Sequence, residues 1–332
     1  MSKDLHALIV CHAGAGLGLG HLARSIVVAR ALHQELGINV NLLIQGDSVQ
    51  RTDLAEFDHQ FLGLEEDLVS TIQEQARHHN AQVIVLDLYP HLVPEDIDKL
   101  LQELRRAGCK VICVDALVSH RENLDMVFIP SFRFSPPDGL NGTAPILFGW
   151  DCFLLNVKRL AIEWKPGKQV LVLAGGSDVT GLGKTLPTLL NAALPVGTDL
   201  HWVTGPYAQQ PVWPNSPRFS MLNHQSPSGL DDLMVRANYA VTVYGVSFFE
   251  LLYFGVPTVV FSPYGNRDDG DLAAIAAEGG AIVAKDEVDA VTKLKELMAD
   301  DKLAAALSQH ARQRLSVPGG HKFAQAVAEL LA

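Results

Sequence analysis

The chain is poor in cysteine, in positive charge and in long apolar runs. Its four cysteines follow no zinc-binding spacing, so we expect buried, reduced thiols at Cys11, Cys109, Cys113 and Cys152. Lysine and arginine total 26 against 37 acidic residues, and the net charge of −11 argues against a nucleic-acid-binding surface. No apolar run approaches the roughly 20 residues that span a bilayer.

The N-terminal residues also lack the long apolar core of a secretory signal. We therefore expect a cytoplasmic protein, and peripheral contact with a membrane face is compatible with this sequence. At 332 residues the chain is more than twice a usual domain in length, which predicts two domains. We expect an N-terminal domain over 1–150, a linker over 151–167, a second domain over 168–315 and a C-terminal helix over 316–332.

What the chain does have is a strand, a glycine loop and a helix within residues 8–33. An apolar strand precedes glycines at four alternating positions, Gly14, Gly16, Gly18 and Gly20. Apolar residues then recur at helical spacing from Leu22. Such glycines let the backbone approach a ligand closely, and the amides at a helix N-terminus favour anions.

Two charged or titratable side chains open this helix. His21 stands in its first turn and Arg24 one turn later. An imidazole in a glycine cradle is a candidate general base near neutral pH, and the alternative is a polar first-turn residue satisfied by the backbone. Arg24 could contact a phosphate or be an ordinary surface charge.

The rest of the sequence repeats this strand–helix alternation. Short apolar strands are predicted at 38–44, 82–86 and 110–114, and the second of these delivers Asp87 at its carboxyl end, where ligands of open α/β sheets gather. The pattern restarts at 169–174 after a proline-rich break. We therefore predict an α/β protein with two Rossmann-like, doubly wound parallel sheets and a ligand cleft between the halves.

A second glycine turn follows the strand at 169–174. Gly175, Gly176 and Ser177 could hold a diphosphate together with the start of the following helix, or could form a tight turn without a ligand. A true phosphate-binding P-loop is disfavoured because it would need glycine where Asp178 stands.

A third cluster begins with a turn at Gly245, Val246 and Ser247 and continues into an apolar helix. Glu250 is the single charge in that helix, so it could accept hydrogen bonds from a ribose diol. It could instead interact favourably with its own helix dipole. The acidic segment 266–271 fits no EF-hand spacing, and no metal site is predicted there.

In this order and spacing, the motifs resemble those of the GT-B nucleotide-sugar enzymes. The motifs are Gly18-Leu-Gly20-His21-Leu-Ala-Arg24, Leu86-Asp87-Leu-Tyr89, Val114-Asp115, Leu147-Phe-Gly149, Ala174-Gly-Gly-Ser-Asp178, Ser247-Phe-Phe-Glu250 and Phe254-Gly-Val-Pro257. The likeness is greatest to the group holding the UDP-sugar hydrolase of pseudaminic acid synthesis and related spore-coat polysaccharide proteins. It extends more distantly to the lipid-linked GlcNAc transferase of peptidoglycan synthesis.

The resemblance implies a GT-B fold and an enzyme that consumes a nucleotide-activated sugar, with UDP as the expected nucleotide. The C-terminal half would bind this donor through Glu250 on the ribose and the two glycine turns on the diphosphate. Gly18, Gly20 and Arg24 would approach the donor from the other half. His21 would act as general base, Asp87 would position the substrate, and no metal or cofactor is expected.

Several functions remain open at this point. A transferase in cell-envelope or surface polysaccharide synthesis would use a glycan, lipid or small-molecule acceptor, whereas a hydrolase would use water. A nucleotide-binding protein without chemistry and a nicotinamide dehydrogenase are further alternatives. The chain departs from the hydrolase pattern at His12, where that group has an aspartate, and at Asn266-Arg267.

Overall fold

The computed structural model describes residues 5–14, 16–227 and 229–332, and the chain divides into two compact units. Unit 1 comprises Met1–Asn156 together with Pro318–Ala332, and unit 2 comprises Val157–Val317. The segment 151–167, predicted as a linker, is thus divided between the two units. The C-terminal segment belongs to unit 1. No helix in the described part of the chain is long and apolar enough to cross a membrane.

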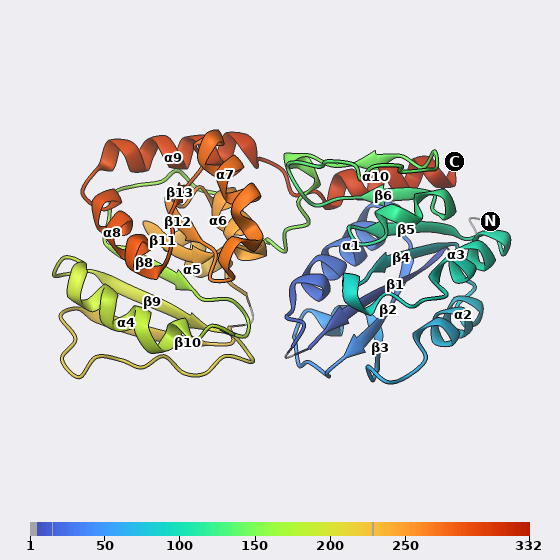
Figure 1. The fold of residues 1–332 in the computed structure, drawn as a ribbon, viewed down its shortest axis with the longest axis horizontal. Coiled ribbons are helices and arrows are strands. Elements are labelled where there is room, and N and C mark those ends of the chain that lie inside the picture. The colour runs from blue at the N-terminus through green and yellow to red at the C-terminus, as the bar shows by residue number, and fades with distance from the viewer. Residues whose placement is uncertain (1–4, 15, 228) are drawn as a thin grey trace. The chain divides into compact units, whose positions relative to one another are not determined.

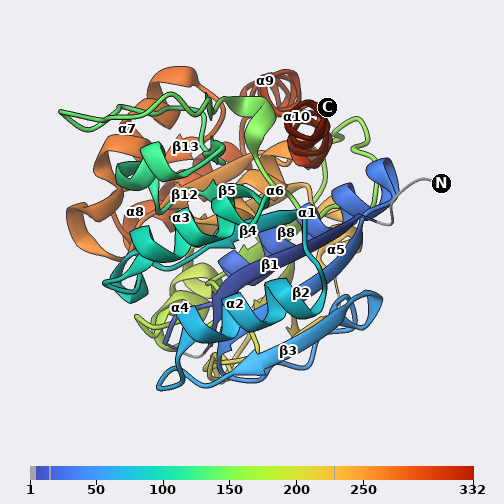
Figure 2. The same cartoon turned by 90° about the vertical axis from the view of Figure 1, so that its right-hand side faces the viewer.

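Unit 1 is built on a seven-stranded sheet in the order β3-β2-β1-β4-β5-β6-β7, and every strand pairing in it is parallel. Helices cover both faces (Figures 1 and 2), so the central strands are nearly continuous apolar runs. The strands are β1 (His6–Ala13), β2 (Asn39–Gly46), β3 (Asp58–Leu62), β4 (Val83–Asp87), β5 (Lys110–Val114), β6 (Met126–Phe128) and β7 (Ile146–Leu147).

Side chains of β1 alternate between the two cores of this unit. Ile9 and Cys11 join the core that includes α1 (Gly20–Leu36) and α10 (Gly320–Leu331). Leu8 and Val10 join the core that includes α2 (Leu68–His78) and α3 (Ile97–Arg106). Four short 3-10 helices complete the unit, η1 (Leu54–Glu56), η2 (Pro90–Leu92), η3 (Val118–Asn123) and η4 (Trp150–Cys152).

The last helix closes the first of these cores. Phe323 and Val327 of α10 are fully buried in it. Gly320 lets α10 approach α1, because a Cβ at this position would lie 3.2 Å from Cγ1 of Val27. The C-terminal helix is therefore an integral part of the N-terminal unit.

Unit 2 repeats the architecture with six parallel strands in the order β10-β9-β8-β11-β12-β13. This order corresponds to β3-β2-β1-β4-β5-β6 of unit 1, and both are the 3-2-1-4-5-6 order of doubly wound dinucleotide-binding sheets. The strands are β8 (Gln169–Leu173), β9 (Asp199–Thr204), β10 (Ser220–Gln225), β11 (Tyr239–Val243), β12 (Thr258–Phe261) and β13 (Ile282–Val283).

The helices of unit 2 are α4 (Leu182–Ala193), α5 (Asp231–Arg236), α6 (Val246–Phe254), α7 (Asp269–Glu278), α8 (Glu287–Leu297) and α9 (Asp301–Arg314), with η5 at Gly265–Asp268. The apolar α6 is buried from Phe248 through Phe254. A buried helix shows little amphipathic periodicity, and this explains the continuous run FFELLYF in the sequence.

The two doubly wound sheets are confirmed. The proline-rich break that precedes the second unit contains the edge strand β7. After α8, Asp300 begins the further helix α9, because its carboxylate accepts the backbone N–H groups of Lys302 and Leu303 at 3.1 and 2.9 Å.

Candidate active site

Each sheet has one point where the connections turn to opposite sides, between β1 and β4 in unit 1 and between β8 and β11 in unit 2. Ligands of doubly wound sheets bind outside the carboxyl ends of the strands at this point. In unit 1, His21 lies in the segment that follows β1, and Asp87 is the last residue of β4. In unit 2, the segments that follow β8 and β11 carry the turns at Gly175–Ser177 and Gly245–Ser247.

The glycine loop of unit 1 is a closed turn. Gly14 donates its N–H to the carbonyl of Gly18 at 3.2 Å, and Gly18 donates back at 2.8 Å. Gly18 has φ of +77°, which a residue with a side chain rarely adopts. A Cβ on Gly14 would lie 2.7 Å from Oδ2 of Asp47. These contacts bring the end of β1 close to the start of α1, which begins at Gly20 and His21.

A buried carboxylate joins the first turn of α1 to the end of β4. Asp87, which is 1% exposed, accepts hydrogen bonds from Arg24 Nε at 2.7 Å and from Arg24 Nη2 at 2.6 Å. His21 Nδ1 lies 2.8 Å from the same carboxylate. His21 and Arg24 reach Asp87 together because residues three apart share one helix face. Asp115, after β5, lies 3.5 Å from Arg24 Nη1.

Electrostatics keep Asp87 ionised in this site. Burial alone would raise the pKa of its carboxyl, but the charges of Arg24 and His21 and their hydrogen bonds hold that pKa below its usual range. One arginine thus lies between two carboxylates, Asp87 and Asp115. A carboxylate in contact with an imidazole stabilises the imidazolium that forms when the ring takes up a proton.

The contacts of His21 favour one tautomer. Nδ1 lies 2.8 Å from the Asp87 carboxylate and 3.2 Å from the Asp87 backbone carbonyl, which are acceptors, and 3.2 Å from the donor Nη2 of Arg24. Since Nη2 of Arg24 also donates to the Asp87 carboxylate at 2.6 Å, a proton on Nδ1 satisfies both acceptors and leaves the lone pair of the neutral ring on Nε2. The side chain is 16% exposed, and its ring lies 5.7 Å from that of Tyr89. His21 can therefore act as a base toward a bound hydroxyl or water.

A second imidazole, that of His12, holds the turn after β4 through a hydrogen bond to its backbone. His12, which is 1% exposed, accepts the backbone N–H of Tyr89 on Nδ1 at 2.8 Å. Its Nε2 lies 3.1 Å from the side-chain carbonyl of Gln45 and donates to it. Burial lowers the pKa of His12, in agreement with a neutral ring. The sequence drew attention to His12 only as a departure from a family pattern, and the structure shows that it fixes the chain next to Asp87.

The first turn of unit 2 is held by a carboxylate. Asp178 accepts the N–H of Leu182 on Oδ1 and that of Gly183 on Oδ2, both at 2.8 Å. Asp178 thus occupies two of the amides at the start of α4, which the sequence offered to a diphosphate. Gly175, with φ of +87°, Gly176 and Ser177 precede this capped turn.

The second turn of unit 2 opens α6. Gly245 stands at its N-cap, and no side-chain cap covers this end within the described residues. Val246 and Ser247 are half-buried, and Glu250 in the second turn of the helix is 8% exposed. Tyr244 donates from its hydroxyl to Asp271 at 3.0 Å, which joins this turn to α7. The positive end of the α6 dipole is therefore directed toward the carboxyl edge of the sheet.

Solved structures with the same architecture match the chain over nearly its whole length. MurG of Acinetobacter baumannii superposes with a TM-score of 0.65 at 14% identity, covering 98% of this chain and 99% of that one. The spinosyn forosaminyltransferase SpnP gives 0.69 at 12% identity, covering 99% and 100%. MnaA of S. aureus, solved with UDP, gives 0.63 at 12% identity, covering 98% and 97%.

The chain has the GT-B fold. No protein-family model matches the sequence, and no curated protein does. The predicted fold class is confirmed, and the cleft between the halves of this GT-B chain stays a prediction.

The predicted site residues form two groups, one in each unit. His21, Arg24 and Asp87 form one cluster in unit 1, where Arg24 is neither an ordinary surface charge nor a free phosphate ligand, because Asp87 engages two of its donor groups. In unit 2, the turns at Gly175–Ser177 and Gly245–Ser247 follow the neighbouring strands β8 and β11. No cluster of metal-binding side chains is found within residues 5–14, 16–227 and 229–332.

Sequence reasoning missed Gly205, which supports the first of these turns. A Cβ on Gly205 would lie 2.3 Å from the carbonyl oxygen of Gly176. Tyr207 also donates its N–H to that oxygen at 3.2 Å. A glycine directly after the strand β9 was the available signal, but its partner Gly176 is distant in sequence. The loop after β9 therefore sets the position of the turn after β8.

Proposed function

We propose that the protein is a glycosyltransferase that uses a nucleotide-activated sugar, with UDP as the expected nucleotide. The observation that carries the proposal is the His21–Asp87 pair, in which a buried carboxylate contacts Nδ1 of the imidazole at the switch point of the sheet. Its GT-B neighbours include proteins solved with UDP or thymidine diphosphate. Cell-envelope or surface polysaccharide synthesis is the proposed setting.

In the proposed reaction, His21 Nε2 takes the proton of an acceptor hydroxyl as its oxygen attacks the anomeric carbon of the sugar. The bond between that carbon and the diphosphate oxygen breaks, and the diphosphate leaves. Asp87 stabilises the imidazolium, and Arg24 keeps Asp87 ionised. A positioned base of this kind contributes about 10²–10⁴-fold to the rate.

Unit 2 is proposed to bind the donor. Backbone amides at Gly245, Val246 and Ser247 and the dipole of α6 would stabilise the departing diphosphate. Gly175, Gly176 and Ser177 would approach it from the neighbouring strand, and Glu250 would accept hydrogen bonds from the ribose diol. Glu250 is buried, and a hydrogen bond between its carboxylate and a bound ribose would be strong because little water competes for it.

The test is the release of UDP from a panel of UDP-sugars, compared between the wild type, His21→Ala and the control His33→Ala. His33 is an exposed histidine near the C-terminal end of α1. We expect His21→Ala to lower turnover by about 10²–10⁴ while UDP affinity is kept. The control should retain wild-type turnover. Wild-type turnover in His21→Ala would exclude His21 as the general base.

The same assay identifies the acceptor class. Release of UDP only after an acceptor is added supports a transferase, whereas steady release together with free sugar makes water the acceptor. Binding of UDP without turnover of any sugar and acceptor pair supports a nucleotide-binding protein without chemistry. An absorbance change with a bound nicotinamide would support a dehydrogenase instead.

A further inference from the structure

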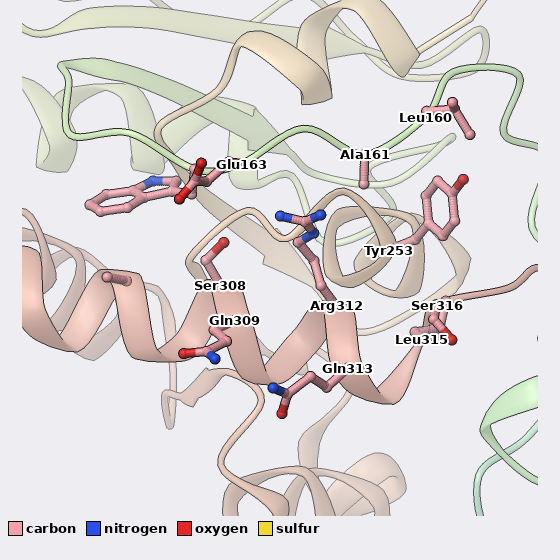
Figure 3. Close-up of a pocket in the computed structure, with 12 residues that line it drawn as sticks. Leu160, Ala161, Glu163, Tyr253, Ser308, Gln309, Arg312, Gln313, Leu315 and Ser316 are labelled. Carbon is pink, nitrogen blue, oxygen red and sulfur yellow. The ribbon is translucent and has the colours of Figure 1, made fainter.

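Unit 2 contains a cavity of about 870 Å³ that the proposed reaction does not use. This volume is typical of small-molecule sites, which range from about 300 to 1,000 Å³. Its walls come from α9, the C-terminal end of α6 and the segment that enters the unit (Figure 3), namely Leu160, Ala161, Glu163, Trp164, Tyr253, Ala305, Ser308, Gln309, Arg312, Gln313, Leu315 and Ser316.

The cavity is separate from the proposed donor site. Tyr253 lies near the C-terminal end of α6, whereas the donor is proposed to bind at Gly245, at the other end of the same helix. The two positions are eight residues apart in the sequence, which corresponds to about 12 Å along the helix axis. A ligand in this cavity would therefore not overlap the diphosphate.

One face of α9 supplies the polar wall. Ser308, Gln309, Arg312 and Gln313 recur at three- and four-residue spacing and line the cavity. The buried residues Ala304, Leu307 and Ala311 form the adjoining face of the helix, and Ser308, also buried, lies at the border between the two faces. This wall offers a guanidinium, a hydroxyl and two amides. The facing wall includes the ring of Tyr253 and the apolar side chains of Leu160 and Ala161.

Gly255 explains how Arg312 reaches the cavity. The glycine follows α6 with φ of +69°, and a Cβ there would lie 2.6 Å from both Cγ and Cδ of Arg312. The same Cβ would lie 3.0 Å from the Ser308 hydroxyl. Without a Cβ, the arginine stem lies against the backbone, and Figure 3 shows its nitrogen atoms directed toward the segment with Ala161 and Glu163.

The guanidinium of Arg312 has no ion-pair partner in the part of the chain that the structure describes. Glu163 also lines the cavity, but it is exposed and forms no ion pair with Arg312 among these residues. By contrast, Arg314 on the same helix pairs with Glu278 at 3.0 Å. An unpaired, half-buried arginine in a cavity is an anion-binding group, because its planar fork matches carboxylate and phosphate oxygens.

We propose that this cavity binds a small hydroxylated anion, either a sugar phosphate or a sugar acid. Arg312 would bind the anionic group together with the Ser308 hydroxyl. Gln309 and Gln313 would exchange hydrogen bonds with ligand hydroxyls, since an amide both donates and accepts. Tyr253 and Leu160 would contact the carbon skeleton. The proposal is independent of the transferase reaction, because it concerns binding alone.

The test is calorimetric titration of the full chain with glucose 1-phosphate, glucuronate, inorganic phosphate and glucose, with UDP present throughout to occupy the proposed donor site. We expect one or both sugar anions to bind with Kd near 1 mM or tighter, and glucose not to bind at this level. Binding of glucose 1-phosphate alone would show that the site selects a phosphate group, and binding of glucuronate alone would show that it selects a carboxylate.

Variants locate the site. Arg312→Gln should weaken binding at least about tenfold, the usual scale of a lost charge-assisted contact. Arg314→Gln, on the same helix but outside the cavity, should bind as the wild type does. Ala305→Glu places a carboxylate at an exposed position of the wall, so it should abolish binding while the melting temperature is kept.

Three results would overturn the proposal. One is the absence of binding by either sugar anion at about 10 mM. Another is equal affinity in the wild type and in Arg312→Gln, which would place the anion elsewhere. The third is binding of inorganic phosphate as tight as that of glucose 1-phosphate, which would show that the hydroxylated sugar contributes nothing to binding.

Discussion

Replacing Asp87 by asparagine tests the central cluster, because this change keeps the shape of the side chain and removes its charge. The wild-type carboxylate accepts from Arg24 Nε at 2.7 Å, from Arg24 Nη2 at 2.6 Å and from His21 Nδ1 at 2.8 Å. An asparagine side chain has one oxygen and one NH₂ group, so its NH₂ must face at least one of these donors. Among the residues that the structure describes, Arg24 then keeps Asp115, at 3.5 Å, as its anionic partner.

The expected cost follows from burial. Arg24 is 13% exposed and Asp87 is 1% exposed, so the change leaves a nearly buried charge without its main partner. Removing one member of a buried pair costs about 3–5 kcal/mol, and we expect the lower end, about 3 kcal/mol, because Asp115 remains. A domain has about 5–15 kcal/mol of stability in total, so Asp87→Asn should still fold.

A second substitution separates stability from chemistry. Arg24→Met in the Asp87→Asn background removes the orphaned charge and fills a similar volume, so it should restore about 1–3 kcal/mol. Turnover should not recover in this double variant, because an amide in place of the carboxylate no longer stabilises the proton on His21 Nδ1. Both variants should lose about 10²–10⁴ in turnover.

The stability difference should also depend on pH. The folded-state pKa of Asp87 is depressed below its usual value, since Arg24 and His21 outweigh the effect of burial. A depressed carboxyl contributes stability above its unfolded pKa of about 3.9 and loses it as the pH falls toward the folded pKa. The advantage of the wild type over Asp87→Asn should therefore be constant near neutral pH and shrink below about pH 4.

Urea unfolding, followed at pH 7 and at several values down to pH 3, measures these differences. A free energy of unfolding for Asp87→Asn within about 0.5 kcal/mol of the wild type at pH 7 would refute the reasoning about the buried pair. An advantage that stays unchanged down to pH 3 would contradict the assignment of its pH dependence to Asp87.

Three further predictions concern other parts of the chain. Glu250→Gln should weaken UDP binding by about 1–3 kcal/mol in a titration, and unchanged affinity would exclude Glu250 from the ribose site. Gly205→Ala should destabilise unit 2 by about 1–3 kcal/mol because the new Cβ meets Gly176, whereas Gly229→Ala, with no atom within 4 Å of its Cβ, should not. The cysteines are all buried, and burial raises the pKa of Cys11 to about 12, so a thiol reagent at pH 8 should react only after unfolding; rapid labelling of the native protein would contradict this.

Features encoded within one short segment could be predicted from the sequence. The strand, the glycine turn and the start of α1 lie within residues 8–33, and their order shows directly in the pattern of apolar and glycine residues. The apolar strands of both sheets were equally visible, because parallel strands buried on both faces need continuous apolar runs. His21 and Asp87 could each be singled out on these grounds.

Contacts between distant segments could not be predicted in the same way. The pairing of Arg24 with Asp87 depends on β1 and β4 being neighbours, which the order of strands in the sheet determines and the local sequence does not. The contact of Gly205 with Gly176 has the same origin. The sequence showed Asp178 only as a residue that disfavours a P-loop, and it did not show that the carboxylate oxygens accept the first N–H groups of α4.

The position of α10 has a consequence for how the protein is made. Unit 1 is completed by a helix that is synthesised only after the whole of unit 2. At about 5–20 residues per second, the ribosome needs on the order of ten to thirty seconds between adding Asn156 and adding the last residues of α10. During this interval the surface of α1 that α10 later covers stays open, so the nascent N-terminal unit is a natural client for chaperones.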